Sequence, residues 1–90
     1  MIREHYICRG RVQGCGFRYK ASHAARALGL TGYVRNCDDG SVEMEVQGEG
    51  GLIAKMLEML NRDLYIRIDD IQCHDMALRD DEYGFSVRGW

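Results

Sequence analysis

Long hydrophobic runs are missing from this sequence. A helix that spans a membrane needs about 20 consecutive apolar residues, and no run within the 90 residues comes near that length. The N-terminus, Met1–His5, leads directly into a strand pattern and lacks the basic and apolar regions of a signal peptide. We therefore expect a cytoplasmic protein with no membrane partner.

The patterns typical of metal sites and disulfides are also missing. The sequence contains four cysteines and three histidines, which are Cys8, Cys15, Cys37, Cys73, His5, His23 and His74. No two of the cysteines form a C-x-x-C pair, and the histidines lie at no spacing typical of metal ligands. We expect reduced thiols that are mostly packed in the interior, and no metal site.

The sequence also lacks an excess of basic residues. Twelve Lys and Arg residues stand against 14 Asp and Glu residues, which gives a formal net charge of −2. Binding to a nucleic-acid backbone usually requires a clear basic excess, so nucleic acid is not expected as the main partner. A hydrophobic content of 46% in a chain of this length is typical of one ordinary globular domain, residues 1–90.

What the sequence does contain is a glycine-rich segment, residues 10–18, which reads Gly-Arg-Val-Gln-Gly-Cys-Gly-Phe-Arg. Glycines let a loop turn several backbone N–H groups toward one point, and the start of a following helix adds unpaired donors and partial positive charge. Arg18, on that first turn, carries a planar fork of donors that fits two oxygens of a phosphate or carboxylate. The spacing alone fits an anion site and a plain glycine-rich turn with a surface arginine equally well.

Three known types of phosphate-binding loop do not match this segment. A Walker A loop needs a Lys-Ser or Lys-Thr pair, whereas Phe17 and Arg18 follow Gly16 here. The dinucleotide-binding fingerprint needs a further glycine three residues after Gly16, which is absent. A phosphatase with a cysteine nucleophile needs a longer loop than the segment between Cys15 and Arg18.

Hydrophobic periodicity predicts strands and helices along the rest of the chain. A period of two favours strands, and a period near 3.6 favours helices. The predicted order is a strand at 3–9, a helix at 18–28, strands at 31–36 and 41–47, a helix at 50–61, a strand around 68–73 that is irregular at 69–70, and a closing strand at 85–88. This order predicts an α+β fold, the ferredoxin-like βαββαβ sandwich, with an antiparallel sheet and both helices on one face. The charged loop 79–82 is expected to be solvated.

Two segments of the chain resemble the motifs of the acylphosphatase family. Gly10–Arg18 resembles its phosphate loop, and Gly32–Asn36 followed by Asp39–Glu43 resembles its second motif. The resemblance extends over about the whole chain, and the family has the same ferredoxin-like fold. It implies hydrolysis of small acyl phosphates to a carboxylate and inorganic phosphate, without metal or cofactor.

The resemblance also implies roles for particular residues. Arg18 is expected to be the catalytic arginine that binds the phosphoryl group, and Asn36 is expected to position the attacking water. The phosphate-binding loop that completes the cradle with its backbone N–H groups comprises Gly14, Cys15, Gly16 and Phe17. The implied partners are a small acyl phosphate and inorganic phosphate, which is both product and competitive ligand, and we expect a monomer.

Two positions depart from the family's usual pattern. Cys15 stands where valine is usual, and we interpret it as a small hydrophobic residue in the same slot; oxidation of Cys15, or pairing with Cys37, is the alternative. Asn61–Leu64 stands where the family commonly has Gly-Pro, and the whole sequence contains no proline. The second departure leaves the path of that loop open but does not touch the catalytic pair.

Two other functions fit the predicted topology. One is a non-catalytic anion-binding module, such as the acylphosphatase-like domain of the carbamoyl-transfer protein of hydrogenase maturation; zinc-finger-like and transferase segments follow that domain, whereas this sequence ends at Trp90. The other is a small RNA-binding domain, which stacks bases on aromatic residues of its sheet. We rank it lower because the outward positions of Val42–Val46 are acidic. The motifs contact only the phosphate, so they leave the acyl group of the substrate open.

Overall fold

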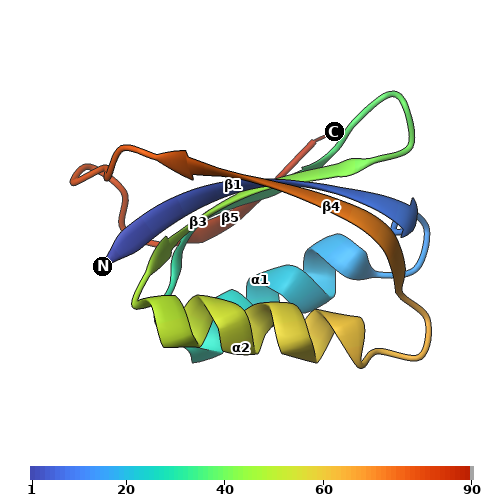
Figure 1. Cartoon of the computed structure of the whole chain (residues 1–90), viewed down its shortest axis with the longest axis horizontal. Helices are drawn as coiled ribbons and strands as arrows, with labels where there is room; N and C mark the ends of the chain where they lie inside the picture. Colours follow the sequence, from blue (N-terminus) through green and yellow to red (C-terminus); the bar gives the residue numbers. More distant parts are fainter. Residues whose placement is uncertain (90) are drawn as a thin grey trace.

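Residues 1–89, which the structure describes, form one five-stranded sheet with two helices side by side on a single face (Figure 1). The structure is a computed structural model, and Trp90, the last residue of the predicted domain, lies outside the described residues. The elements in chain order are β1 (Ile2–Arg11), α1 (Phe17–Ala27), β2 (Thr31–Asn36), β3 (Val42–Gly48), α2 (Gly50–Asn61), β4 (Arg67–Met76) and β5 (Phe85–Arg88). The α+β ferredoxin-like sandwich predicted from the sequence is confirmed.

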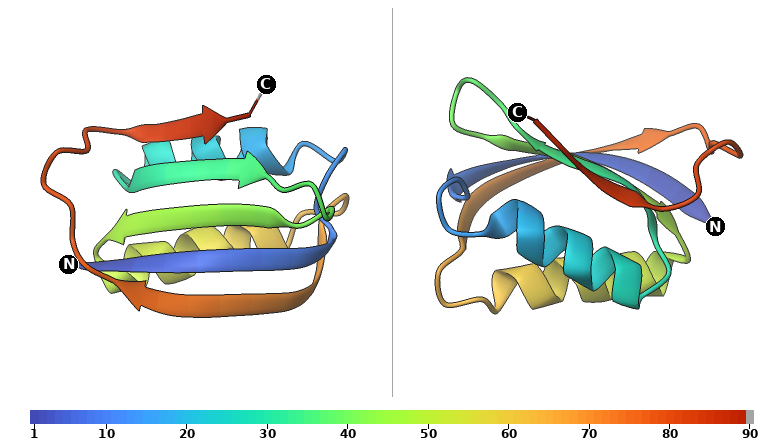
Figure 2. Two further views of the ribbon diagram at one scale, coloured as in Figure 1. Left: turned by 90° about the horizontal axis from the view of Figure 1, so that it is seen from above. Right: turned by 180° about the vertical axis from the view of Figure 1, so that it is seen from behind.

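The sheet has the strand order β4-β1-β3-β2-β5. β1 pairs antiparallel with both β3 and β4, and β2 pairs antiparallel with β3, as the predicted topology requires. The closing strand β5 is the exception, because it pairs parallel with β2 and makes the sheet mixed. After β4 the chain crosses one end of the sheet to the opposite edge and enters β5 in the direction of β2 (Figure 2). β5 is thereby placed beside the cavity described below.

The hydrophobic core lies between the sheet and the helices and follows the predicted periodicity. Tyr6 and Cys8 on β1 are buried, whereas their neighbours along the strand are not. Most of the buried side chains of α1 are alanines, whose small size lets this helix lie close to the sheet. The buried side chains of α2, whose bounds match the prediction, are Ile53, Met56 and Leu60.

β4 differs from the prediction in its length and in its exposure. The strand is ten residues long and forms an edge of the sheet. Ile71 and Cys73 are therefore exposed on it. The expectation that the thiols are mostly packed does not hold for Cys73, because an edge strand is covered on fewer sides than a central one.

The predicted irregularity at the start of β4 is present as a register shift against β1. Arg9 faces Asp70 and Gly10 faces Ile68, which leaves Asp69 as an extra residue in β4. Gly10 is required here because a Cβ atom on it would lie 2.2 Å from a carbonyl oxygen of the neighbouring strand. This close approach fixes the point from which the glycine-rich segment leaves the sheet.

A buried arginine ties the loop before β5 to the sheet. Arg3 on β1 is only 2% exposed; its Nε donates to Glu45 and its Nη1 donates to Glu82, each at 2.8 Å. Burial by itself raises the pKa of Glu82, but the hydrogen bonds and the charge of Arg3, with further contributions from Thr31 and Arg79, together hold this pKa below its ordinary value. The prediction that the charged loop 79–82 is simply solvated holds for the exposed side chains of residues 79–81 but is wrong for Glu82, which anchors the loop and so helps to place β5.

Candidate active site

The glycine-rich segment forms the turn between β1 and α1. Gly14 and Gly16 have φ angles of 74° and 80°, in the left-handed region that glycine adopts readily and that costs energy for other residues. Gly16 is the N-cap residue of α1 and has no side chain to accept hydrogen bonds from the first N–H groups of the helix. The first turn also carries no acidic side chain. This end of α1 therefore presents N–H donors and partial positive charge.

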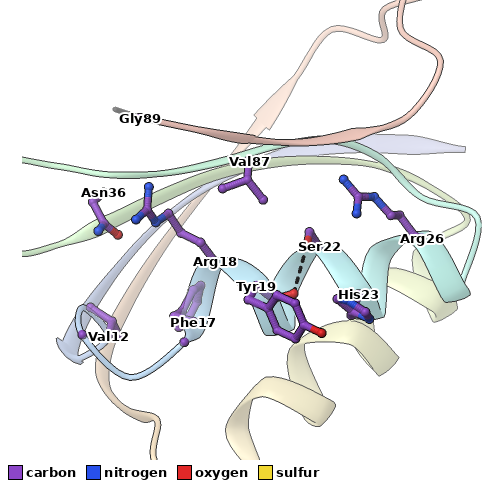
Figure 3. A pocket seen from close by; sticks show the side chains of 12 residues that line it. Val12, Phe17, Arg18, Tyr19, Ser22, His23, Arg26, Asn36, Val87 and Gly89 are labelled. Atoms are coloured by element: carbon purple, nitrogen blue, oxygen red, sulfur yellow. Dashed lines mark hydrogen bonds between the residues drawn. The ribbon is translucent and has the colours of Figure 1, made fainter.

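A cavity of about 520 Å³ opens at this end of the sheet. The glycine-rich turn, one side of α1, the end of β2 and the strand β5 surround it (Figure 3). Gly14, Gly16 and Phe17 of the predicted phosphate-binding loop line the cavity, as do Arg18 and Asn36. The fold thus brings the two predicted catalytic side chains to one cavity from separate elements.

Arg18 lies on the first turn of α1 and reaches the end of β5. Its Nη1 donates to the carbonyl oxygen of Arg88 at 3.0 Å. The backbone passes so close at Gly89 that a Cβ atom there would lie 2.8 Å from the same nitrogen. These contacts orient the half-buried Arg18 side chain along the wall of the cavity (Figure 3).

Gln13 holds the glycine-rich turn against the hairpin that follows Asn36. The Gln13 Nε2 group donates to the carbonyl oxygen of Cys37 at 2.8 Å and to that of Ser41 at 2.9 Å. Cys37 is next to Asn36 in the chain, so the bond to its carbonyl oxygen fixes the position of Asn36 relative to the turn. Sequence reasoning missed Gln13 because its acceptors are backbone groups from another part of the chain. Its place inside the glycine motif is the one feature of the sequence that could have indicated it.

Asp39 closes the same hairpin. Hydrogen bonds from the hydroxyl and the backbone N–H of Ser41, followed by that from Arg9, hold the pKa of Asp39 well below its usual range. The carboxylate therefore stays ionised at neutral pH and keeps these hydrogen bonds. The turn that supports Asn36 is fixed as a result.

Cys15 packs away from the cavity. Its side chain lies against the hydrophobic core, with Sγ 3.5 Å from the carbonyl oxygen of Arg11. This position fits the interpretation of Cys15 as a small hydrophobic residue in the valine slot. Cys15 and Cys37 are both free thiols.

The loop after α2, whose path the sequence left open, is held by Asp63. Its carboxylate accepts hydrogen bonds from Lys20 of α1 and from the backbone N–H of Tyr65, each at 2.9 Å. Lys20 also donates to the carbonyl oxygen of Cys15 at 3.1 Å. Lys20 thus connects this loop to the glycine-rich turn without the proline that is usual in the family.

The residues that line the cavity make it cationic. Within residues 1–89 they include the guanidinium groups of Arg18 and Arg26 but no carboxylate, although the chain as a whole carries a net charge of −2. His23 is exposed, as predicted, and its ring lies 4.2 Å from that of Tyr19. A cationic cavity beside helix N–H groups is suited to an anionic ligand.

Residues 1–89 contain neither a cluster of metal ligands nor a membrane-spanning helix. No group of side chains among residues 1–89 has the composition and spacing to hold a metal ion. No helix in the same range is both long enough and apolar enough to cross a membrane.

Fold and cavity together define the class of protein: a ferredoxin-like α+β domain with a cationic, glycine-lined cavity at one end of its sheet. Comparison with protein families then identifies the particular one. The acylphosphatase family model matches residues 4–87. The chain belongs to the acylphosphatase family.

Individual relatives agree with this assignment. The acylphosphatase of Bifidobacterium longum is 40% identical over 90 residues, which cover 98% of this chain and 93% of that protein. The crystal structure of the acylphosphatase from Bacillus subtilis has a TM-score of 0.89 and 30% identity, and the match covers 99% of this chain and 100% of that one. The structure of T. kodakarensis HypF has a TM-score of 0.84 and 28% identity, over 99% of this chain but only 12% of that one.

Proposed function

We propose that this acylphosphatase hydrolyses small acyl phosphates to a carboxylate and inorganic phosphate in the cavity between the glycine-rich turn, α1 and β5. One observation carries the proposal: Arg18, at the start of α1, and Asn36, at the end of β2, line the same cationic cavity. Membership of the family supports the same reaction.

Arg18 and the glycine-rich turn bind the phosphoryl group. The guanidinium directs N–H donors at phosphoryl oxygens, where charge-assisted hydrogen bonds are strong. The other donors in this proposal are the backbone N–H groups of Gly14, Cys15, Gly16 and Phe17. Because these donors are already fixed before the reaction, they stabilise charge that develops in the transition state without further reorganisation.

Asn36 positions the attacking water. Its carboxamide oxygen accepts a hydrogen bond from the water and holds it in line with phosphorus, opposite the acyl oxygen. The water oxygen bonds to phosphorus. The bond between phosphorus and the oxygen that bridges it to the acyl carbon breaks, and the carboxylate leaves with the electron pair. Both protons of the water end on the phosphate product.

This reaction makes modest demands on acid and base catalysis. An acyl phosphate is a mixed anhydride, and its carboxylate is a good leaving group, so a strong general acid or base is not required. Positioning of the water and stabilisation of charge supply most of the rate acceleration. The proposed mechanism therefore uses neither a metal nor a cofactor.

We further propose that the enzyme is a cytoplasmic monomer, one domain over residues 1–90, without a nucleic-acid partner. The sheet face opposite the helices supports the last point. Glu43 on this face pairs with His5, and Glu45 accepts a hydrogen bond from the hydroxyl of Tyr33. The Tyr33 ring is in turn covered by the guanidinium of Arg88 at 3.9 Å. A face whose glutamates are already paired with basic side chains, and whose Tyr33 ring is already covered, is a poor platform for stacking bases.

Hydrolysis of benzoyl phosphate by the purified protein in the presence of EDTA tests the proposed function. We expect release of benzoate and inorganic phosphate at a rate proportional to enzyme concentration, unaffected by the chelator and competitively inhibited by added phosphate. The rate is followed by the change in ultraviolet absorbance. Absence of turnover, with phosphate still raising the melting temperature, would contradict the proposal and mark the chain as a non-catalytic anion-binding domain.

A further inference from the structure

The cationic cavity is longer than a site for one phosphoryl group requires. Arg26 lies eight residues after Arg18 on α1, a rise of about 12 Å along the helix, and it lines the same cavity. Figure 3 shows both guanidinium groups directed toward β5, with Val87 between them. The phosphate cradle therefore occupies only one end of the cavity.

The contacts of the two arginines with β5 give an independent measure of their separation. Arg18 donates to the carbonyl oxygen of Arg88 at 3.0 Å, and the Nη2 of Arg26 donates to that of Phe85 at 3.1 Å. These carbonyl groups are three residues apart on one strand, which corresponds to about 10 Å. The two guanidinium groups are thus held at a separation that a short, extended acyl chain spans.

The Arg26 side chain is available to a ligand. It is exposed, and the bond to Phe85 uses one of the several N–H donors of a guanidinium group. The wall between the two arginines includes the apolar side chain of Val87 and the buried residue Ser22, whose hydroxyl donates to the carbonyl oxygen of Tyr19. The order along the cavity is therefore an anion cradle, a partly apolar stretch and a second cationic group.

We propose that Arg26 binds a second oxyanion at the far end of the acyl group, so that this enzyme prefers acyl phosphates whose acyl chain ends in a carboxylate or a phosphate. This inference rests on the proposed function, because it places the phosphoryl group at Arg18. Arg26 acts here as a specificity residue and takes no part in the bond changes at phosphorus. The planar fork of its donors fits either kind of oxyanion.

Matched pairs of substrates test the role of Arg26. Succinyl, glutaryl and adipyl phosphate are each compared with the uncharged acyl phosphate of the same length, butanoyl, pentanoyl or hexanoyl phosphate, and a further arm uses an acyl phosphate that ends in a phosphate ester. The measured quantity is the ratio of kcat/KM within each pair. We expect at least one terminal anion to raise kcat/KM in the wild type by about tenfold, and added salt to reduce this preference.

Three variants separate recognition of the second anion from a purely structural role. Arg26→Gln is expected to lose most of the preference, and Arg26→Lys is expected to retain part of it, because lysine keeps the charge without the planar fork. Lys55→Gln removes the same charge from an exposed position on α2 and should leave the ratio unchanged. Melting temperatures show whether loss of the bond to Phe85 loosens β5.

Two outcomes would overturn the inference while leaving the proposed function intact. One is a ratio near unity for every pair in the wild type. The other is an equal fall in kcat/KM for both members of each pair in Arg26→Gln, which would assign Arg26 to holding β5 alone. Failure of the wild type to hydrolyse any of these compounds would instead overturn the proposed function, and this inference with it.

Discussion

Replacement of Arg18 by alanine is expected to lower kcat/KM for benzoyl phosphate by about three orders of magnitude. Loss of a single donor to a developing oxyanion costs roughly 3–4 kcal/mol in comparable sites, and Arg18 supplies both a charge and a fork of donors. The variant is also expected to lose inhibition by inorganic phosphate, because the same side chain binds the product. Steady-state kinetics with and without phosphate measure both effects.

Controls for this prediction separate chemistry from stability. Arg18 donates to the carbonyl oxygen of Arg88, so the melting temperature of the variant shows whether the end of β5 has loosened. Arg18→Lys keeps the charge without the fork and should retain more activity than the alanine variant. Arg62→Ala removes an exposed arginine after α2, remote in sequence from the turn, and should behave as wild type. An Arg18→Ala enzyme within a few-fold of the wild-type rate would contradict the central role of this residue.

Replacement of Asn36 by alanine is expected to lower kcat by about two orders of magnitude while leaving the inhibition constant of phosphate near its wild-type value. The reason is that the proposed role of Asn36 is to place the water, and misplacement of a reacting group by about 1 Å costs roughly a hundredfold in rate. Binding of the phosphoryl group, in contrast, depends on Arg18 and the glycine-rich turn. The two constants are obtained from kcat with benzoyl phosphate and from competition by phosphate.

Two further variants sharpen the test of Asn36. Asn36→Asp keeps an acceptor for the water but adds a negative charge beside the phosphoryl group, so it should weaken phosphate inhibition as well as turnover. Asn61→Ala, at the exposed C-terminal end of α2, is the matched control. Turnover at the wild-type rate in Asn36→Ala, or a parallel loss of phosphate affinity and rate, would show that Asn36 does not position the water.

Local patterns were sufficient to predict most of the fold. The bounds of α2 match those expected from its hydrophobic periodicity, and β2 matches the strand predicted at 31–36. The irregular start of β4 was also visible, because the paired acidic residues at 69–70 interrupt its alternation. In each case the signal lies within a few neighbouring residues, where periodicity and turn chemistry act.

Features that depend on distant partners were not visible in the sequence. The parallel pairing of β5 with β2 follows from a crossing of the whole sheet, and no local pattern encodes it. The burial of the ion pair between Arg3 and Glu82 has the same origin, since its two members lie near opposite ends of the chain. Both features bear on the site, because Glu82 anchors the loop before β5 and β5 forms one wall of the cavity.

The candidate site was predictable only in part. By themselves, the glycines and Arg18 fit an anion site and a plain turn equally well. Only together with the second motif, around Asn36, do they indicate an anion site. Gln13, which bonds the turn to the hairpin, and Arg26, at the far end of the cavity, were missed. Gln13 lies inside the glycine motif, but the motif assigns no role to its side chain, and Arg26 belongs to no spacing pattern with a known chemical meaning. Each acquires its role from groups that folding brings near.

The most direct test of the mechanism is a single turnover of benzoyl phosphate in water enriched in the heavy oxygen isotope, with mass spectrometry of both products. Attack at phosphorus by the water that Asn36 is proposed to hold predicts that the label appears in inorganic phosphate and that benzoate remains unlabelled. Label in benzoate would mean that water attacks the acyl carbon, and would contradict the assignment of the cavity as a site for phosphoryl transfer to water.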